Sequence, residues 1–330
     1  MKNAVLIDFA QPSDWDFVRG LKDSTGREWD VEGVPSNRDH GSIGKQLLRY
    51  WKYFSLAIGV ALRRREYAQI VSWQQFYGII IAWFSRLFRL KNVPDVYIMT
   101  FIYKDKKGVI GRIYKRFIRY ALHAECVKKV ICFSGTEPEY YSKLFQLGID
   151  RFASAVLGIE DASAGYEAVD EGYYLSAGRS NRDYRFMTRA WKEEEDLYII
   201  SDSISENGGE GIKVFDHCYG EDFLRMLSAC HAVIIPLEDE NISSGQLVIL
   251  QAFMFGKPVI ATSNITANEY VSDGVNGYII PKTDEALHEA VRRTRDPETY
   301  KALSEQARNA FTGRYSMYSL GASIGKITAH

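Results

Sequence analysis

The sequence has few cysteines and no long hydrophobic run. Four cysteines among 330 residues are too few for the disulfide framework of a small secreted protein and indicate free thiols in a reducing compartment. The longest apolar runs, such as FSLAIGVAL at 54–62, fall well short of the roughly 20 residues that span a bilayer. The first ten residues, MKNAVLIDFA, predict a buried strand rather than a signal peptide. We therefore expect a cytoplasmic protein.

Low-complexity tracts and internal repeats are also absent, and the composition, 46% hydrophobic and 25% charged, is that of a globular protein with room for two domains. Short β-rich runs alternate with helical patterns, which is typical of βαβ units and parallel sheets. The acidic, less periodic stretch 149–172 predicts a connection between domains. The expected strands are 4–9, 68–73, 95–101, 129–134, 173–178, 197–202, 212–216, 231–236, 258–263 and 277–281.

A formal net charge of −1 hides a strong asymmetry. Between Lys45 and Tyr120 there are 16 Lys and Arg against three acids, a local net charge of +13. Aromatic residues interrupt the basic ones, as in LLRYWKYF at 47–54 and GRIYKRFIRY at 111–120. This pattern predicts that the basic 45–120 region binds an anionic membrane surface, as a peripheral protein on its inner face. A solvated helix face is the alternative. Nucleic acid is not expected as a partner, because no recognisable motif accompanies the charge.

The stretch SAGRSNRDY at 176–184 has the features of an anion site. An expected strand ends at Gly178, and Arg179 and Arg182 lie at the start of the following helix. A helix start exposes unpaired N–H groups and the positive end of the helix dipole, and guanidinium groups bind phosphates in a fork. The alternative is a capped helix whose arginines pair with surface acids.

A second helix start has similar features. Ser243, Ser244 and Gly245 precede the helix LVILQAFMF, where serines can cap and glycine lets a ligand approach the backbone. Gly256 and Pro258 end that helix, so a helix with ordinary signals at both ends is the simpler interpretation. Two such sites after strands of one sheet favour a nucleotide diphosphate between them.

The order of GRSNRDY, SSGQLVILQAFMFGKPVIATS and EYVSDGVNGYIIP resembles family-4 glycosyltransferases of the GT-B fold, over roughly residues 173–285. The resemblance implies an α/β protein with two Rossmann-like domains and a cleft between them. Residues 1–160 would form the acceptor- and membrane-facing domain and 161–312 the nucleotide-sugar-binding domain. Residues 313–330 would form a helix that crosses back to the first domain. The stretch FIYKDKKGVIGRIYKRF is similar to bacterial capsule and exopolysaccharide enzymes.

The resemblance also implies a retaining hexosyltransferase that uses a nucleotide-diphosphate sugar, a UDP-sugar more than a GDP-sugar, without an obligatory cofactor or metal. Arg179 and Arg182 would hold the donor diphosphate. Members of the family carry a pair of acidic residues near the helix LVILQAFMF, and Glu240 would serve as the first of the two. When the motifs are aligned, the two acids of the family correspond to Ser243 and Gln251. Gln251 would therefore take the place of a carboxylate that binds the ribose, and this replacement would weaken donor binding by about 1 kcal/mol. The implied donor-binding residues are Gly178, Asp216, His217, Ser243, Ser244, Gly245, Gln246, Gln251 and Glu269.

On the acceptor side, Asp14 and Asp16 follow the first strand, and Tyr103 lies where the family often has a histidine. We expect a polyprenyl-diphosphate-linked or oligosaccharide acceptor in cell-surface polysaccharide synthesis. A sugar-nucleotide 2-epimerase of the same fold is one alternative. Another is a catalytically silent GT-B subunit that regulates a partner transferase, which the missing acid pair would favour. Cys218 and Cys230 each adjoin a histidine, but core thiols are expected there and no metal site.

Overall fold

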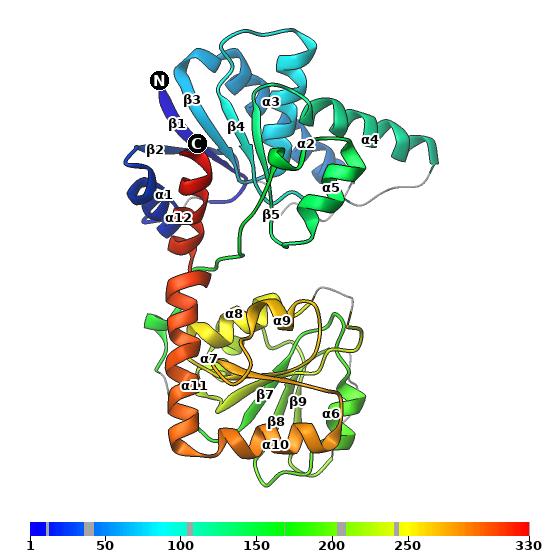
Figure 1. Cartoon of the computed structure of the whole chain (residues 1–330), viewed down its shortest axis with the longest axis vertical. Helices are drawn as coiled ribbons and strands as arrows, with labels where there is room; N and C mark the ends of the chain where they lie inside the picture. The colour runs from blue at the N-terminus through cyan, green and yellow to red at the C-terminus, as the bar shows by residue number, and fades with distance from the viewer. Residues whose placement is uncertain are drawn as a thin grey trace. The chain divides into compact units, whose positions relative to one another are not determined.

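The structure, a computed structural model, describes residues 1–10, 13–35, 43–103, 108–167, 169–202, 209–240 and 244–329. The chain divides into two compact units, which we call unit 1 (Met1–Leu157 with Met317–His330) and unit 2 (Gly158–Ser316). Each unit has one six-stranded parallel sheet with helices on its faces (Figure 1). Both units are therefore α/β layers with parallel sheets, as the alternating pattern predicted.

The sheet of unit 1 has the strand order β2-β1-β3-β4-β5-β6. Val5 of the central strand β1 pairs with Val31 on one side and with Val71 on the other. The chain leaves β1 toward β2 and then returns to β3 on the opposite side, so the β1/β3 boundary is a topological switch point. The strands are β1 (Lys2–Ile7), β2 (Trp29–Gly33), β3 (Tyr67–Ser72), β4 (Asp95–Ile98), β5 (Val127–Cys132) and β6 (Phe152–Ser154).

Two hydrophobic cores cover the two faces of this sheet. Alternate residues of β1 point to opposite faces: Leu6 packs in the core beneath α2 to α5, and Ile7 packs in the core beneath α1 and α12. The helices are α1 (Asp16–Thr25), α2 (Ile43–Leu62), α3 (Gln75–Leu87), α4 (Gly108–Leu122), α5 (Glu137–Phe145) and α12 (Met317–Thr328), with 3-10 turns η1 (Arg64–Glu66) and η2 (Ile149–Arg151).

The last helix, α12, packs closely against α1 in unit 1 (Figure 1). Glycines make this possible, because a Cβ at Gly321 would overlap the carbonyl group of Phe17, and one at Gly20 would overlap that of Tyr318. At the end of the helix, Gln69 Nε2 donates to the carbonyl oxygen of Thr328 at 2.9 Å. The two backbones thus touch, and residues from both ends of the chain complete one core.

Unit 2 has the strand order β12-β11-β10-β7-β8-β9, which from the β9 edge is the doubly wound dinucleotide-binding order with its switch point between β7 and β10. The strands are β7 (Tyr174–Ala177), β8 (Leu197–Ile200), β9 (Ile212–Phe215), β10 (Ala232–Ile235), β11 (Val259–Thr262) and β12 (Gly277–Ile280). The helical elements are η3 (Ser163–Gly165), α6 (Tyr184–Ala190), α7 (Glu221–Ala229), α8 (Gln246–Met254), α9 (Ala267–Tyr270), α10 (Asp284–Thr294), α11 (Pro297–Ala310) and the π-helical turn η4 (Phe311–Tyr315).

The connection expected at 149–172 begins with structure of its own. It contains the 3-10 turn η2 and the strand β6, which pairs with β5 as an edge of the unit 1 sheet. A strand of three residues carries too little alternation to be recognised from sequence. Within the described ranges, no helix is both long and apolar enough to cross a bilayer.

Candidate functional site

The candidate site of unit 2 begins at the turn that follows β7. Gly178 has a φ of 115°, a conformation that favours glycine, and a Cβ there would lie 2.7 Å from Nη2 of Arg182. Asp183 caps α6 by accepting the backbone N–H of Phe186 at 2.9 Å. The stretch GRSNRDY therefore wraps the Arg182 side chain back over the end of its own strand.

Arg182 lies at the β7/β10 switch point with its guanidinium fixed by oxygen atoms. Nε donates to the carbonyl oxygen of Ala177 at 3.0 Å, and Nη1 donates to that of Ser180 at 2.8 Å and to Ser244 Oγ at 3.1 Å. Burial lowers the pKa of Arg182, although arginine stays protonated at any physiological pH. These acceptors are all neutral, so the positive charge is oriented but not neutralised.

The start of α8 meets Arg182 through Ser244. Ser244 Oγ donates to the carbonyl oxygen of Ser180 at 2.8 Å, and the Ser244 N–H donates to Thr266 Oγ1 at 3.1 Å. Gly245 follows with a φ of 95°, and no side chain of the described residues caps the helix, so the first turn of α8 presents backbone N–H groups. The structure thus brings together the two stretches that the sequence predicted as anion sites. Ser243 lies outside the described residues.

A cavity of about 280 Å³ opens beside this helix start. Its wall is mostly apolar, with a few polar side chains, which is typical of a small-molecule site. Four of the predicted donor residues line it: Gly178, Arg179, His217 and Gln251. The remaining lining residues are Ala177, Ile200, Ser201, Asp202, Cys218, Tyr219, Gly220, Phe223, Leu247 and Val248.

Arg179 differs from Arg182 because its charge is already paired. Its Nη2 lies 2.7 Å from Asp202 Oδ2 and also donates to the Tyr219 hydroxyl, while the guanidinium lies over the Tyr219 ring. The Tyr219 hydrogen bond and the Asp202 charge raise the pKa of Arg179. Sequence reasoning missed Asp202 and Tyr219. Asp202 had a signal, since it stands at the carboxyl end of an expected strand, where ligands of parallel sheets bind.

The predicted carboxylates do not line the cavity. Asp216, Glu240 and Glu269 are all exposed to solvent. Asp216 lies 3.9 Å from His217, and the carbonyl oxygen of Glu240 accepts the N–H of Ile265 at 3.0 Å. Gln246, the first residue of α8, is also outside the cavity lining.

The predicted acceptor-side residues all belong to unit 1, where Asp14 and Asp16 line one cavity and Tyr103 does not. Asp14 and Asp16 line a cavity of about 510 Å³ beside α1 and β2, and Asp16 pairs with Arg19 at 2.9 Å. Tyr103 is only 6% exposed, its ring stacks on Tyr114, and its N–H donates to the Tyr141 hydroxyl. The Tyr103 ring is thus part of the packed core of unit 1.

A carboxylate that the sequence analysis did not select occupies the switch point of unit 1. Asp8 follows β1 and is 7% exposed. Its Oδ2 accepts the Tyr53 hydroxyl at 2.7 Å and Gln74 Nε2 at 3.1 Å, which joins the ends of β1 and β3 to α2. Asp8 lies within the strand expected at residues 4–9, and the sequence therefore predicted it only as part of a buried strand.

Within the described ranges, no group of three or more His, Cys, Asp and Glu side chains is arranged to hold a metal ion. Cys230 is completely buried, and burial raises the pKa of its thiol to about 12, so that it is a core thiol.

Residues 192–310 match the family model described as Glycosyl transferases group 1, and a comparison with curated proteins gave no match. Among solved structures, a glycosyltransferase from Rickettsia africae is 11% identical with a TM-score of 0.64, covering 99% of this chain and 97% of that one. HepE of Anabaena in complex with UDP is 14% identical, with a TM-score of 0.61 and complete coverage of both chains. Sucrose-phosphate synthase from Thermosynechococcus elongatus is 15% identical with a TM-score of 0.62, covering 99% and 98%.

These similarities span both units and show that the chain has the GT-B fold, as the sequence resemblance implied. The family match lies within unit 2, the unit that contains Arg182, α8 and the cavity. The family match and the fold together support a glycosyltransferase enzyme.

Proposed function

We propose that the protein is a family-4-type retaining hexosyltransferase that moves a sugar from a nucleotide-diphosphate sugar to a polyprenyl-diphosphate-linked glycan, in capsule or exopolysaccharide synthesis. The observation that carries the proposal is the oriented, uncompensated guanidinium of Arg182 at the start of α8, beside a cavity of about 280 Å³. In this arrangement the diphosphate binds at Arg182 and the helix start, and the nucleoside enters the cavity.

Gln251 supports the nucleoside assignment. Its side chain lines the cavity from α8, and its amide can accept a hydrogen bond from one ribose hydroxyl and donate to another. Tyr219 and Phe223 also line the cavity, and their rings supply flat apolar surface for the base. The crystal structures of Anabaena HepE in complex with UDP and with UDP-glucose favour a UDP-sugar here.

The chemistry requires no protein nucleophile in this proposal. As the bond between the sugar and the diphosphate breaks, negative charge develops on the leaving oxygen, and Arg182 and the dipole of α8 stabilise it. The leaving diphosphate then accepts the proton of the acceptor hydroxyl on the same face of the sugar, so the anomeric configuration is retained. Arg179, held by Asp202, positions the diphosphate, and Glu240 with Ser243 would contact the sugar.

An exposed apolar surface in unit 1 supports a lipid-linked acceptor. The N-terminal halves of α2 and α4 carry Trp51, which is 70% exposed, and Ile110, which is 80% exposed. Both helices follow strands of a parallel sheet and therefore begin at its carboxyl edge, where ligands of such sheets bind. Arginines and lysines alternate with these apolar side chains, a combination suited to the headgroup layer of an anionic membrane.

The direct test is calorimetric titration of the protein with UDP and with GDP, followed by incubation of UDP-sugars with a polyprenyl-diphosphate-linked sugar. We expect UDP to bind, sugar to be transferred, and NMR of the product to show a retained anomeric configuration. If neither nucleotide binds, the donor assignment is wrong and a silent GT-B subunit becomes the better interpretation.

A further inference from the structure

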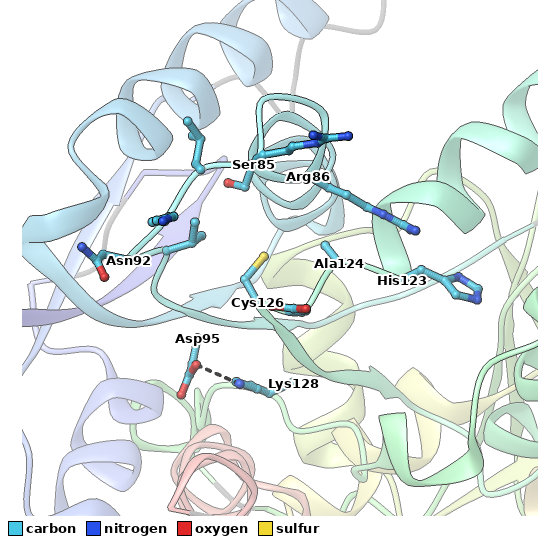
Figure 2. Close-up of a pocket in the computed structure, with 13 residues that line it drawn as sticks. Ser85, Arg86, Asn92, Asp95, His123, Ala124, Cys126 and Lys128 are labelled. Atoms are coloured by element: carbon cyan, nitrogen blue, oxygen red, sulfur yellow. Dashed lines mark ion pairs between the residues drawn. The ribbon is translucent and has the colours of Figure 1, made fainter.

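Two neighbouring cavities in unit 1 contain several basic side chains each, and in the second cavity basic side chains are the majority. The first, of about 680 Å³, lies among the end of α3, the loop to β4 and the start of β5 (Figure 2). The second, of about 660 Å³, lies along α4 and the end of α5. Arg86 and His123 line both cavities, so the two form one continuous site. Each volume is within the range of roughly 300–1,000 Å³ of small-molecule sites.

The charge of this site is one-sided. Arg112, Arg116, Arg119 and His123 follow one another at i, i+4, i+7 and i+11, which places them on one stripe along α4. No carboxyl group is among the described residues that line the second cavity. In the first cavity, Asp95 pairs with Lys128 at 3.3 Å, as Figure 2 shows, and Glu125 is exposed. The other cations there are Arg89 and Lys91.

Like charges at positions i and i+4 of a helix repel each other and destabilise the helix. Arg112 and Arg116 form such a pair, and so do Lys115 and Arg119. A bound anion would reduce this repulsion between the cations, and anion binding at the site is therefore favoured.

The guanidinium groups of the site are held in place before any ligand binds. Arg86 Nη1 donates to the carbonyl oxygen of Tyr120 at 2.7 Å, and the guanidinium lies 4.4 Å from the centre of the Tyr120 ring. Arg119 Nη2 donates to Gln146 Oε1, and the carbonyl oxygen of Arg119 accepts the His123 Nδ1–H at 2.8 Å. Among the described residues, these contacts leave the other guanidinium nitrogens and His123 Nε2 for a ligand.

The wall of the first cavity contains a further polar group. Ser85 is only 4% exposed, and its hydroxyl has no hydrogen-bond partner among the described residues. A buried hydroxyl without a partner is destabilising. The Ser85 hydroxyl is closed off from solvent, so Ser85 is not counted among the ligands of an anion in this site.

We propose that this site binds a phosphate-bearing anion, with Arg86, Arg119 and His123 as its ligands. Guanidinium groups form paired hydrogen bonds with phosphate, and an imidazole that donates through Nδ1 can also donate through Nε2 once it is protonated. The site is distinct from the donor site. It lies in unit 1 at the amino ends of β4 and β5, whereas the transfer reaction would occur at the carboxyl edge.

The test is a calorimetric titration of the full chain with pyrophosphate. In the variant R86Q/R119Q we expect pyrophosphate affinity to fall at least about tenfold. The matched control R65Q/R314Q removes two exposed arginines that line neither cavity, and its affinity should stay within about twofold of the parent. Both variants leave the unit 2 cavity unchanged. Absence of binding to the parent, or equal binding by the parent and R86Q/R119Q, would overturn the proposal.

If R86Q/R119Q folds poorly, R112Q/R116Q removes two exposed charges from the second cavity and should also weaken binding. Vesicles of phosphatidylglycerol separate the sources of the phosphate. Loss of vesicle binding in R86Q/R119Q would identify a lipid headgroup, and unchanged vesicle binding would identify a soluble phosphate. UDP affinity of R86Q/R119Q should equal that of the parent, so the result does not depend on the proposed transfer activity.

Discussion

At the scale of single residues, the two arginines after β7 illustrate how neighbours decide what a charge can do. Arg179 has a carboxylate partner in Asp202, so an incoming diphosphate would have to compete with it. In the part of the chain that the structure describes, the acceptors of Arg182 are all neutral: Ala177, Ser180 and Ser244. A cation held by neutral groups gains more from a phosphate than one already paired. Arg182 should therefore dominate the binding of the diphosphate.

Replacing Arg182 with glutamine should lower UDP affinity at least about tenfold, because a charged hydrogen bond contributes about 1.5–3 kcal/mol. Calorimetric titration measures the effect. Arg185→Gln is the control, since Arg185 is exposed on α6 and does not line the cavity. Equal UDP affinity of R182Q and R185Q would remove Arg182 from the donor site.

Replacing Gln251 should change UDP affinity less than replacing Arg182 does. Gln251→Ala should lower UDP affinity about two- to tenfold, the equivalent of one neutral hydrogen bond, and Gln251→Glu should preserve or increase it. Gln306→Ala, on the exposed side of α11, should leave the affinity unchanged. If Q251A binds UDP as the parent does, Gln251 does not contact the ribose.

At the scale of elements, the contact between α1 and α12 depends on glycine. Gly321→Ala places a methyl group where the carbonyl of Phe17 lies, and the helices must separate. We expect it to destabilise unit 1 by about 1–3 kcal/mol. Gly59→Ala in α2, where nothing lies within 4 Å of the new Cβ, should instead stabilise by about 0.5–1 kcal/mol. Thermal unfolding of the two variants measures the contrast, and equal shifts in Tm would refute it.

The edge of the unit 1 sheet has a charged contact that depends on pH. Glu32 accepts Lys2 Nζ at 2.6 Å and the Tyr67 hydroxyl at 2.9 Å. Burial raises the pKa of Glu32, but the two hydrogen bonds together with the positive charges of Lys2 and Arg63 outweigh it, and the pKa is lowered overall. A lowered carboxyl pKa stabilises the fold above the unfolded value of about 4.3, and the stabilisation is lost as the pH falls through the folded pKa.

Glu32→Gln should therefore lower the free energy of unfolding at pH 7 by about 1 kcal/mol, which appears as a lower Tm. The difference in Tm between the variant and the parent should shrink below about pH 4. Glu28→Gln is the control. Glu28 is exposed and pairs only with the exposed Lys22, so its replacement should change stability by less than about 0.5 kcal/mol. A difference for E32Q that persists unchanged at acidic pH would contradict the assignment.

Most strands of both sheets could be predicted from sequence, since each is a short apolar run between turn signals. The edge strands β2 and β6 could not. WDVEG contains two acids and a glycine, and FAS is too short to show a period. Strand order follows from packing between distant residues, which one sequence does not display. The return of the C-terminal helix to the first domain was expected only from the family resemblance.

The candidate site was predictable in part. Glycine-containing turns after strands identified Gly178, Arg182 and the start of α8, because such turns need local residue types. Asp202 and Tyr219 come from two other strand ends, and only the fold brings them to Arg179. The reverse holds for Tyr103, whose place in the sequence suggested an acceptor contact but whose ring is part of the unit 1 core.

At the scale of the whole molecule, basic charge is concentrated in one unit, and the exposed apolar side chains of α2 and α4 lie in the same unit. We expect the protein to float with phosphatidylglycerol vesicles at low salt and to be released as the salt concentration approaches about 1 M, where the Debye length is about 3 Å. Neutral vesicles should bind far less.

The double variant W51S/I110S should weaken flotation severalfold, since it removes apolar surface that would enter the headgroup layer. I265S/V275S is the matched control, because both residues are exposed apolar side chains of unit 2. Failure of the parent to float at low salt, or equal loss in both variants, would sink the membrane assignment.

The composition of unit 1 from both ends of the chain has a consequence for biosynthesis. A ribosome makes residues 1–157 first, then all of unit 2, and only then residues 317–328. Domains generally fold as units while the chain emerges. Unit 2 can therefore complete its fold first, while the face of α1 that contains Gly20 is not yet covered by α12. Unit 1 is therefore synthesised first but completes its fold last.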